Sequence, residues 1–254
     1  MMSRYELLLW RDPSMEEVPI DDVAAELVRL VKTFQDVFPE FRPLYLYISG
    51  NGAHDTYEFV DDKGFIADAL SRNEPDRSMA KKKGYTTSVF TEGDLESISI
   101  SMNLGCTSKM LRDSIVINFP FTWPHCDEAP LSKLKRLFCN LAMQFHPYWG
   151  CVTESELTRE KSYMEGDVPQ YLHWLNFLSD KLISKMGRHA IRQMKRIEGY
   201  EKIQKNIFQI GHAPTALHEM SDYAYSRQVI APYGLKRNKM GQILRKLRML
   251  LRNR

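Results

Sequence analysis

Three short segments in the middle of the chain decide the fold: YTTSVF (85–90), ESISISMN (96–103) and DSIVINF (113–119). In the second segment the apolar residues alternate with serines, and in the third Ile115, Ile117 and Phe119 alternate with Val116 and Asn118. A period of two is typical of a strand that has one buried face and one wetter face. Because the connections between the segments are short, they predict an antiparallel meander.

Helical patterns lie on both sides of this meander. Apolar residues recur at helical spacing after Asp21, after Gly64 and between residues 130 and 145. Further strands are expected at residues 3–10 and 44–49, at the point to which HPYWGCVT (146–153) leads, and at IFQIG (207–211). Since the strands cluster and show no regular βαβ alternation, we predict an α+β fold with a mixed or antiparallel central sheet flanked by helices.

Three segments between these elements have less regular patterns. SMAKKKG (78–84) is expected to be a solvated loop, and TESELTREKSYMEGD (153–167) a mobile or boundary segment. The stretch QYLHWLNFLSDKLISKMG (170–187) is expected to end as a helix, with Gly187 just after its last turn.

Charge is distributed unevenly along the 254 residues. The last 20, LKRNKMGQILRKLRMLLRNR, contain eight Lys or Arg and no acid, so the preceding residues hold 27 basic and 32 acidic side chains, a net charge of −5. Hydrophobic residues make up 43% of the chain, enough for one sizeable core. We therefore expect one α+β domain over residues 1–234 and a basic amphipathic helix over 235–254, and the asymmetry indicates an electrostatic partner.

The same composition bears on cellular location. No apolar run reaches the roughly 18 residues of a membrane-spanning helix, and the run LLLW near the start is too short for a signal peptide. The four cysteines, Cys106, Cys126, Cys139 and Cys151, form no CxxC pair. We expect a cytosolic protein with reduced, partly buried thiols.

One stretch, GHAPTALHEMSDY (211–223), has the residue types of a metal or acid-base site. A zincin helix carries HExxH, whereas here His218 and Glu219 are followed by no histidine at the required spacing. No Walker loop, GxSxG or GxGxxG is present either. The residues therefore predict no catalytic group, metal or cofactor. Two alternatives stay open: a hydrolase that uses His212 or His218 with an acid, and an adaptor whose basic tail binds a membrane surface or nucleic acid.

Several stretches, taken in order and spacing, resemble the immunity protein 52 family of bacterial polymorphic-toxin and type VI secretion systems. They are RPLYLYISGNGAHDTYEFVDDKGFIADAL (42–70), SISISMNLG (97–105), SIVINFP (114–120), HPYWGCVT (146–153), YLHWLNFLSDKL (171–182) and IFQIGHAPTALHEMSDYAYSRQVIAPYGL (207–235). The resemblance extends to about Gly234, and the basic tail looks like an addition. The chain departs from the family where Met102-Asn103-Leu104-Gly105 replaces its usual Trp-Asn-Gly stretch.

The resemblance implies an immunity protein that binds a cognate toxin, often a nuclease, and takes no small-molecule substrate. A nuclease presents a positive surface to phosphates, and an inhibitor can cover that surface with carboxylates. Neither a membrane nor nucleic acid is then an expected partner. The toxin-facing carboxylates predicted on this basis are Asp55, Glu58, Asp61, Asp62, Glu92, Asp94 and Glu96. The alternative is that these are ordinary solvated loop acids.

Overall fold

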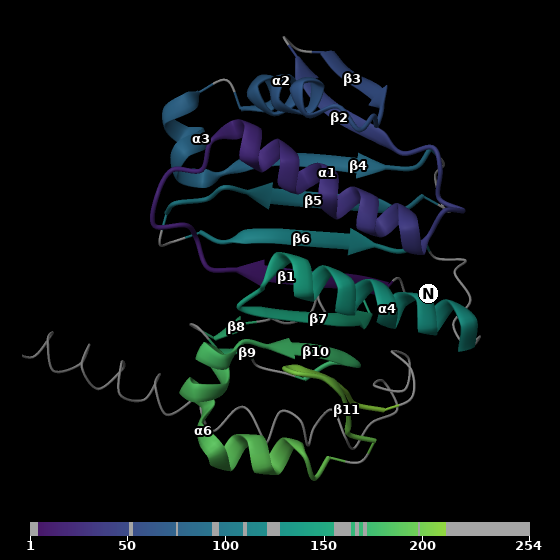
Figure 1. Ribbon diagram of the computed structural model, residues 1–254, viewed down its shortest axis with the longest axis vertical. Helices are drawn as coiled ribbons and strands as arrows, with labels where there is room; N and C mark the ends of the chain where they lie inside the picture. The colour runs from purple at the N-terminus through teal and green to yellow at the C-terminus, as the bar shows by residue number, and fades with distance from the viewer. Residues whose placement is uncertain are drawn as a thin grey trace, which may run out of the picture.

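A ten-stranded antiparallel sheet with the strand order β11-β12-β10-β7-β1-β6-β5-β4-β2-β3 forms the centre of the molecule (Figure 1). The computed structural model describes residues 5–50, 53–74, 76–92, 97–108, 111–120, 128–154, 164–165, 168–169, 172–197 and 199–211. Helices and strands are both abundant and strands of the sheet pair only antiparallel, so the predicted α+β fold is confirmed.

The elements have the following bounds. The strands of the large sheet are β1 (Tyr5–Arg11), β2 (Tyr45–Gly50), β3 (Ala53–Glu58), β4 (Tyr85–Phe90), β5 (Ser99–Leu104), β6 (Asp113–Asn118), β7 (Trp149–Glu154), β10 (Leu175–Leu178), β11 (Glu201–Gln204) and β12 (Ile207–Gln209). A separate two-stranded sheet contains β8 (Met164–Glu165) and β9 (Val168–Pro169). The helices are α1 (Ile20–Val37), α2 (Lys63–Asn73), α3 (Arg77–Lys83), α4 (Glu128–Phe145) and α6 (Asp180–Met194).

One face of the sheet is covered by α1, α2 and α4, and α1 lies between the other two (Figure 1). The apolar stripe of α1, including Leu27, Val31 and Phe34, is fully buried against this face. The alternating residues Ile100, Met102, Ile115 and Ile117 of β5 and β6 belong to the same core. Burial of each such side chain contributes about 2 kcal/mol of hydrophobic free energy, so this core supplies most of what holds the sheet to its helices.

Strand β1 is buried on both faces. Leu7 pairs with Ile117 of β6 and Val152 of β7 on the side of α1 and α4. Its neighbour Leu8 pairs with Cys151 of β7 on the opposite side, where it packs in a second, smaller core. A strand that is buried on both faces needs a continuous apolar run, which explains why three leucines follow one another in this segment.

The second core lies under α6. Leu182, Met186, Ala190 and Met194 form the buried side of that helix, and they pack with Trp149 and other residues of β7, β10 and β12. Helix α6 therefore covers the end of the sheet that contains these three strands and reaches Leu8 of β1. In the described ranges, no helix contributes to a core on this face over β2, β4 and β5.

Two local predictions are wrong. The expected loop 78–84 contains helix α3, because the Asp76 carboxylate accepts hydrogen bonds from the amides of Ser78 and Met79 and so caps a helix start. Gly187 does not end its helix: with φ 81° and ψ 165° it breaks α6 in the middle, and the helix then resumes. It resumes because Ala190 and Met194 continue the buried stripe.

Other predictions fall partly outside the described residues. The basic helix expected at 235–254, the boundary at residue 234, the histidines His212 and His218, and Cys126 all lie there. The remaining cysteines, Cys106, Cys139 and Cys151, are free and buried, and burial raises the pKa of each thiol. Among the described residues, no helix combines the length and the apolar character needed to cross a bilayer.

Candidate partner-binding surfaces

The part of the second sheet face that no described helix covers carries short polar side chains bordered by aromatic rings. We call it the open sheet face. Its side chains are partly or fully exposed, and they come from β2, β4, β5 and β6. They are Tyr45, Tyr47, Thr86, Ser88, Phe90, Ser99, Ser101, Asn103, Ser114 and Asn118.

Hydrogen bonds between neighbouring strands hold these polar groups in place. The hydroxyl oxygens of Ser88 and Ser101 lie 3.1 Å apart, and the Asn118 amide donates to the Ser99 hydroxyl over 3.1 Å. The Asn103 amide donates to the carbonyl of Lys83 over 2.9 Å. Because these side chains are short and already ordered, a partner that docks on them freezes few rotamers.

Aromatic rings border the polar rows. Tyr45 and Phe90 lie opposite each other on β2 and β4, with ring centroids 6.4 Å apart. Tyr, Ser and Asn are the residues that recognition surfaces use, since aromatic rings supply contact area at a small entropy cost and short polar groups supply adaptable hydrogen bonds. The open sheet face therefore has the chemistry of a protein-binding surface.

The predicted carboxylates Asp55 and Glu58 lie on β3, the strand at one edge of the sheet. Glu58 pairs with Tyr45, so it belongs to the side of the open sheet face, whereas Asp55 pairs with Ile48, a residue of the main core. Paired residues share a face and alternate residues do not. The two carboxylates therefore flank opposite faces of one strand.

Two of the other predicted carboxylates, Asp61 and Asp62, have partners on or next to the helices. Asp61 pairs with Lys32 of α1, and the Asp62 carboxylate caps α2 by accepting from the amides of Gly64 and Phe65 at 2.8 and 3.1 Å. Glu92 is exposed and follows β4. Asp94 and Glu96 lie outside the described residues. Asp61 and Asp62 thus have local structural partners, and toxin contact stays a prediction for the seven residues.

A basic surface on α6 was missed by the sequence interpretation, which assigned the basic excess to the last 20 residues. Residues 171–254 hold 17 basic and five acidic side chains, a net of +12, whereas residues 1–170 hold 18 basic and 27 acidic, a net of −9. The excess begins with Lys181, Lys185, Arg188 and Arg192, which follow one another at helical spacing along α6. Counting charge from the start of this helix would have revealed it.

Near the start of α6, three cations surround one aromatic ring. Arg112, Lys181 and Lys185 lie 4.6, 5.6 and 5.4 Å from the centroid of the Tyr148 ring. Asp12 pairs with both Arg112 and Lys181. The ring face and one carboxylate attract these cations, and the cluster fixes this end of α6 against the sheet.

Two buried titratable groups are structural. Arg11 of β1 joins Glu26 of α1 at 2.6 Å and Asp113 of β6 at 2.5 Å. Burial raises the pKa of Asp113, and hydrogen bonds from Arg11 and the Cys106 amide oppose that shift. Burial lowers the pKa of His173 to about 3, which keeps its imidazole neutral at physiological pH. Within the described ranges, no three His, Cys, Asp or Glu side chains are grouped as metal ligands.

Comparison with known proteins gives a likeness of fold. No family model matches the sequence, and no curated protein matches it. The solved structure of the Pseudomonas aeruginosa T6SS protein PA0821 is similar, with a TM-score of 0.55 and 12% sequence identity over 91% of this chain and 72% of that chain. Membership of the immunity protein 52 family stays a prediction. At this identity the two proteins share a fold.

Proposed function

We propose that this chain is a type VI secretion immunity protein that binds a cognate toxin and blocks its active surface. The observation that carries the proposal is the fold likeness to a protein named as a T6SS protein, which spans 91% of this chain. The resemblance of the packing segments to the immunity protein 52 family points to the same role. The inhibitor acts in the cytosol by binding alone and turns over no substrate.

The open sheet face with Glu58 is the contact surface we favour. Its ordered hydroxyl and amide groups offer hydrogen bonds at low entropic cost, and Tyr45 and Phe90 offer apolar contact area. The net charge of −9 over residues 1–170 favours association with the positive surface of a nuclease. A bound inhibitor on that surface excludes the phosphate backbone of the substrate.

Co-expression with the toxin encoded beside this gene tests the proposal. We expect the chain to restore growth and to co-purify with the toxin. A Ser101→Arg variant places a long cation in the middle of the open sheet face and is expected to lose both effects, because it keeps the partner at a distance. The matched control is Met143→Arg on α4, whose side chain is 56% exposed on the helix-covered side.

The two variants separate binding from folding. Both are expected to retain the thermal unfolding midpoint of the parent protein, since neither touches a buried position. Growth rescue by Ser101→Arg at the parental level would move the contact away from the open sheet face. Absence of rescue by the parent protein itself, with the toxin expressed and active, would overturn the immunity role.

A further inference from the structure

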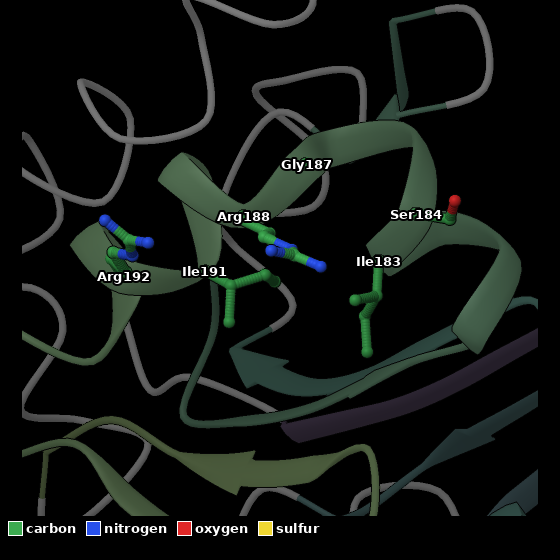
Figure 2. A pocket seen from close by; sticks show the side chains of 6 residues that line it. All are labelled: Ile183, Ser184, Gly187, Arg188, Ile191 and Arg192. Carbon is green, nitrogen blue, oxygen red and sulfur yellow. The ribbon is translucent and has the colours of Figure 1, made fainter.

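A pocket of about 530 Å³ lies against α6 at the point where the helix breaks (Figure 2). The described residues that line it are Ile183, Ser184, Gly187, Arg188, Ile191 and Arg192. In Figure 2 Arg188 lies between Ile183 and Ile191, and Arg192 stands at the far end of the group. The volume is in the range of sites that hold a small ligand or an anchoring side chain.

The sequence builds this pocket through one glycine. Gly187 has a backbone conformation that is essentially restricted to glycine, and it redirects the second half of α6. On the first half, Ile183 and Ser184 face the pocket; on the second half, Arg188, Ile191 and Arg192 do so. On the second half, spacings of three and four residues keep Arg188, Ile191 and Arg192 on one side of the helix. The break therefore turns two helical surfaces into a concave one.

The two arginines of the pocket have no carboxylate partner among the described residues, unlike three other arginines of the molecule. Arg11, Arg72 and Arg112 each pair with a carboxylate. Among the described residues, no carboxylate forms an ion pair with Arg188 or Arg192. Nearby, Lys181 pairs with Asp12 and Lys205 pairs with Asp180. The last 20 residues of the chain contain no acid and cannot supply one. Within the described structure, the two exposed guanidinium groups are therefore open to an anionic ligand.

We infer that this pocket binds an acidic segment of the partner protein, in which an aliphatic side chain is flanked by carboxylates. The two isoleucines form an apolar wall for the aliphatic group, and the two guanidinium groups each present a planar fork of donors to a carboxylate. The identification of that partner as the toxin rests on the proposed function. The chemistry of the ligand is inferred from the residues that line the pocket and does not depend on which protein the partner is.

Two other anionic surfaces fit the pocket less well. Binding of single-stranded nucleic acid to a basic groove uses aromatic side chains for stacking, and the described lining contains none. A membrane-surface helix projects its apolar residues outward into the lipid. Here Ile183 and Ile191 are recessed and pack partly against the second core. A concave site with an apolar wall and two forks favours a protruding protein side chain.

The test uses the full chain and a fluorescein-labelled 12-residue peptide of alternating Glu and Leu. We expect saturable binding by fluorescence anisotropy, and loss of binding when Gln replaces every Glu in the peptide. The Arg188→Gln/Arg192→Gln variant is expected to bind the Glu-Leu peptide at least about tenfold more weakly, because two charge-assisted contacts are removed. Arg188→Lys/Arg192→Lys keeps the charge and loses the forks, so an intermediate affinity is expected.

The matched control is Lys195→Gln/Lys202→Gln, which removes two exposed charges from the same basic region outside the pocket. It is expected to change the peptide affinity less than twofold. An equal loss in this control means that the response is to net charge, and it overturns the pocket assignment. Absence of peptide binding overturns it too, as does tighter binding of a 20-base-pair DNA duplex or of phosphatidylglycerol vesicles that depends on the same two arginines.

These outcomes are separable from the immunity role. If the peptide does not bind and the chain still protects cells from the toxin, the pocket inference is wrong and the proposed function stands. If the peptide binds through Arg188 and Arg192 and the chain gives no protection, the pocket stands and the partner is a protein other than that toxin.

Discussion

The two ends of the sheet use charge differently. At the end covered by α1 and α4, a charge that reaches the interior is fully engaged: Arg11 joins two carboxylates, and its guanidinium carbon lies 4.4 Å from the centroid of the Phe145 ring. At the end covered by α6, Arg188 and Arg192 line a pocket and pair with no carboxylate of the described chain. The charge of Arg11 belongs to the fold, whereas the charges of Arg188 and Arg192 are available to a partner.

The same contrast applies to titratable groups in the interior. In the first region Asp113 is 2% exposed, and Arg11 compensates its charge. In the second, His173 is buried beside Trp149, with ring centroids 6.0 Å apart, and burial holds it neutral. One region stores a compensated charge and the other holds a buried histidine in its neutral form, so they should respond differently to mutation and to pH.

The largest effect is expected from breaking the compensated charge. Arg11→Met leaves Asp113 and Glu26 without their cation, and an uncompensated buried carboxylate is costly. Because Glu26 and Arg11 are partly exposed, we expect a loss of about 3 kcal/mol in the free energy of unfolding, at the lower end of the range for such breaks. Urea denaturation followed by circular dichroism measures it.

The control is an exposed ion pair that, like the Arg11–Glu26 pair, involves a residue of α1. Lys32 and Asp61 are 52% and 50% exposed, so Lys32→Met is expected to cost less than about 1 kcal/mol. Equal costs for the two substitutions would show that the Arg11 cluster contributes no more than a surface pair.

The second effect is a pH dependence that originates at the α6 end. The folded-state pKa of His173 is lowered to about 3, whereas an exposed histidine titrates near 6.5. Between these two pKa values, His173 binds a proton in the unfolded chain and does not bind one in the folded chain. The stability from this group is complete above pH 6.5 and falls as the pH drops towards 3. Between pH 6.5 and 5 the loss is about 2 kcal/mol.

The range from pH 6.5 to 5 lies above the pH at which ordinary carboxylates titrate. The contribution of His173 to the pH dependence of stability can therefore be measured separately from theirs. His173→Leu should remove about 2 kcal/mol of the pH dependence between pH 6.5 and 5, whatever its effect at pH 7. A second measurement does not need the variant: the His173 imidazole should keep one protonation state by NMR from pH 7.5 to 5. A shift of its ring resonances near pH 6 would contradict the prediction.

The elements that could be predicted from the sequence are those fixed by local pattern. The alternation of Ile98, Ile100 and Met102 is visible in the letters, because one face of β5 is buried along its whole length. The break at Gly187 was also visible, but the resumption of α6 was not. It depends on Ala190 and Met194 finding the far face of the sheet, which is tertiary information.

The candidate surfaces were harder to predict for the same reason. Segment 53–58, AHDTYE, shows no apolar alternation that predicts a strand, so its letters do not assign faces to the two carboxylates. Only the register with Tyr45 and Ile48 shows that Glu58 and Asp55 lie on opposite sides of β3. The basic α6 surface can be predicted without knowledge of strand register. A count of charges that begins at residue 235 leaves out the basic residues of α6.

The smallest effect is expected from these two carboxylates. Glu58→Gln should slow association with the toxin about threefold at low salt, because one favourable charge at the rim of an interface acts mainly on the association rate. Asp55→Asn removes the same charge three residues away on the same edge strand, but from the helix-covered side, and is expected to leave the rate within experimental error. Surface plasmon resonance at two salt concentrations measures both rates.

The two substitutions distinguish contact with one side of the sheet from a response to the net charge of the protein. If both substitutions slow association equally, the toxin responds to the summed negative charge of residues 1–170 and to no particular side of the sheet. If Asp55→Asn alone slows it, the toxin binds on the side of α1 and α2. If Glu58→Gln alone slows association, and the effect diminishes as salt screens the charges, the contact lies at the open sheet face. The reason is that Glu58 and Asp55 carry the same charge on the same edge strand and differ in the face of the sheet to which they belong.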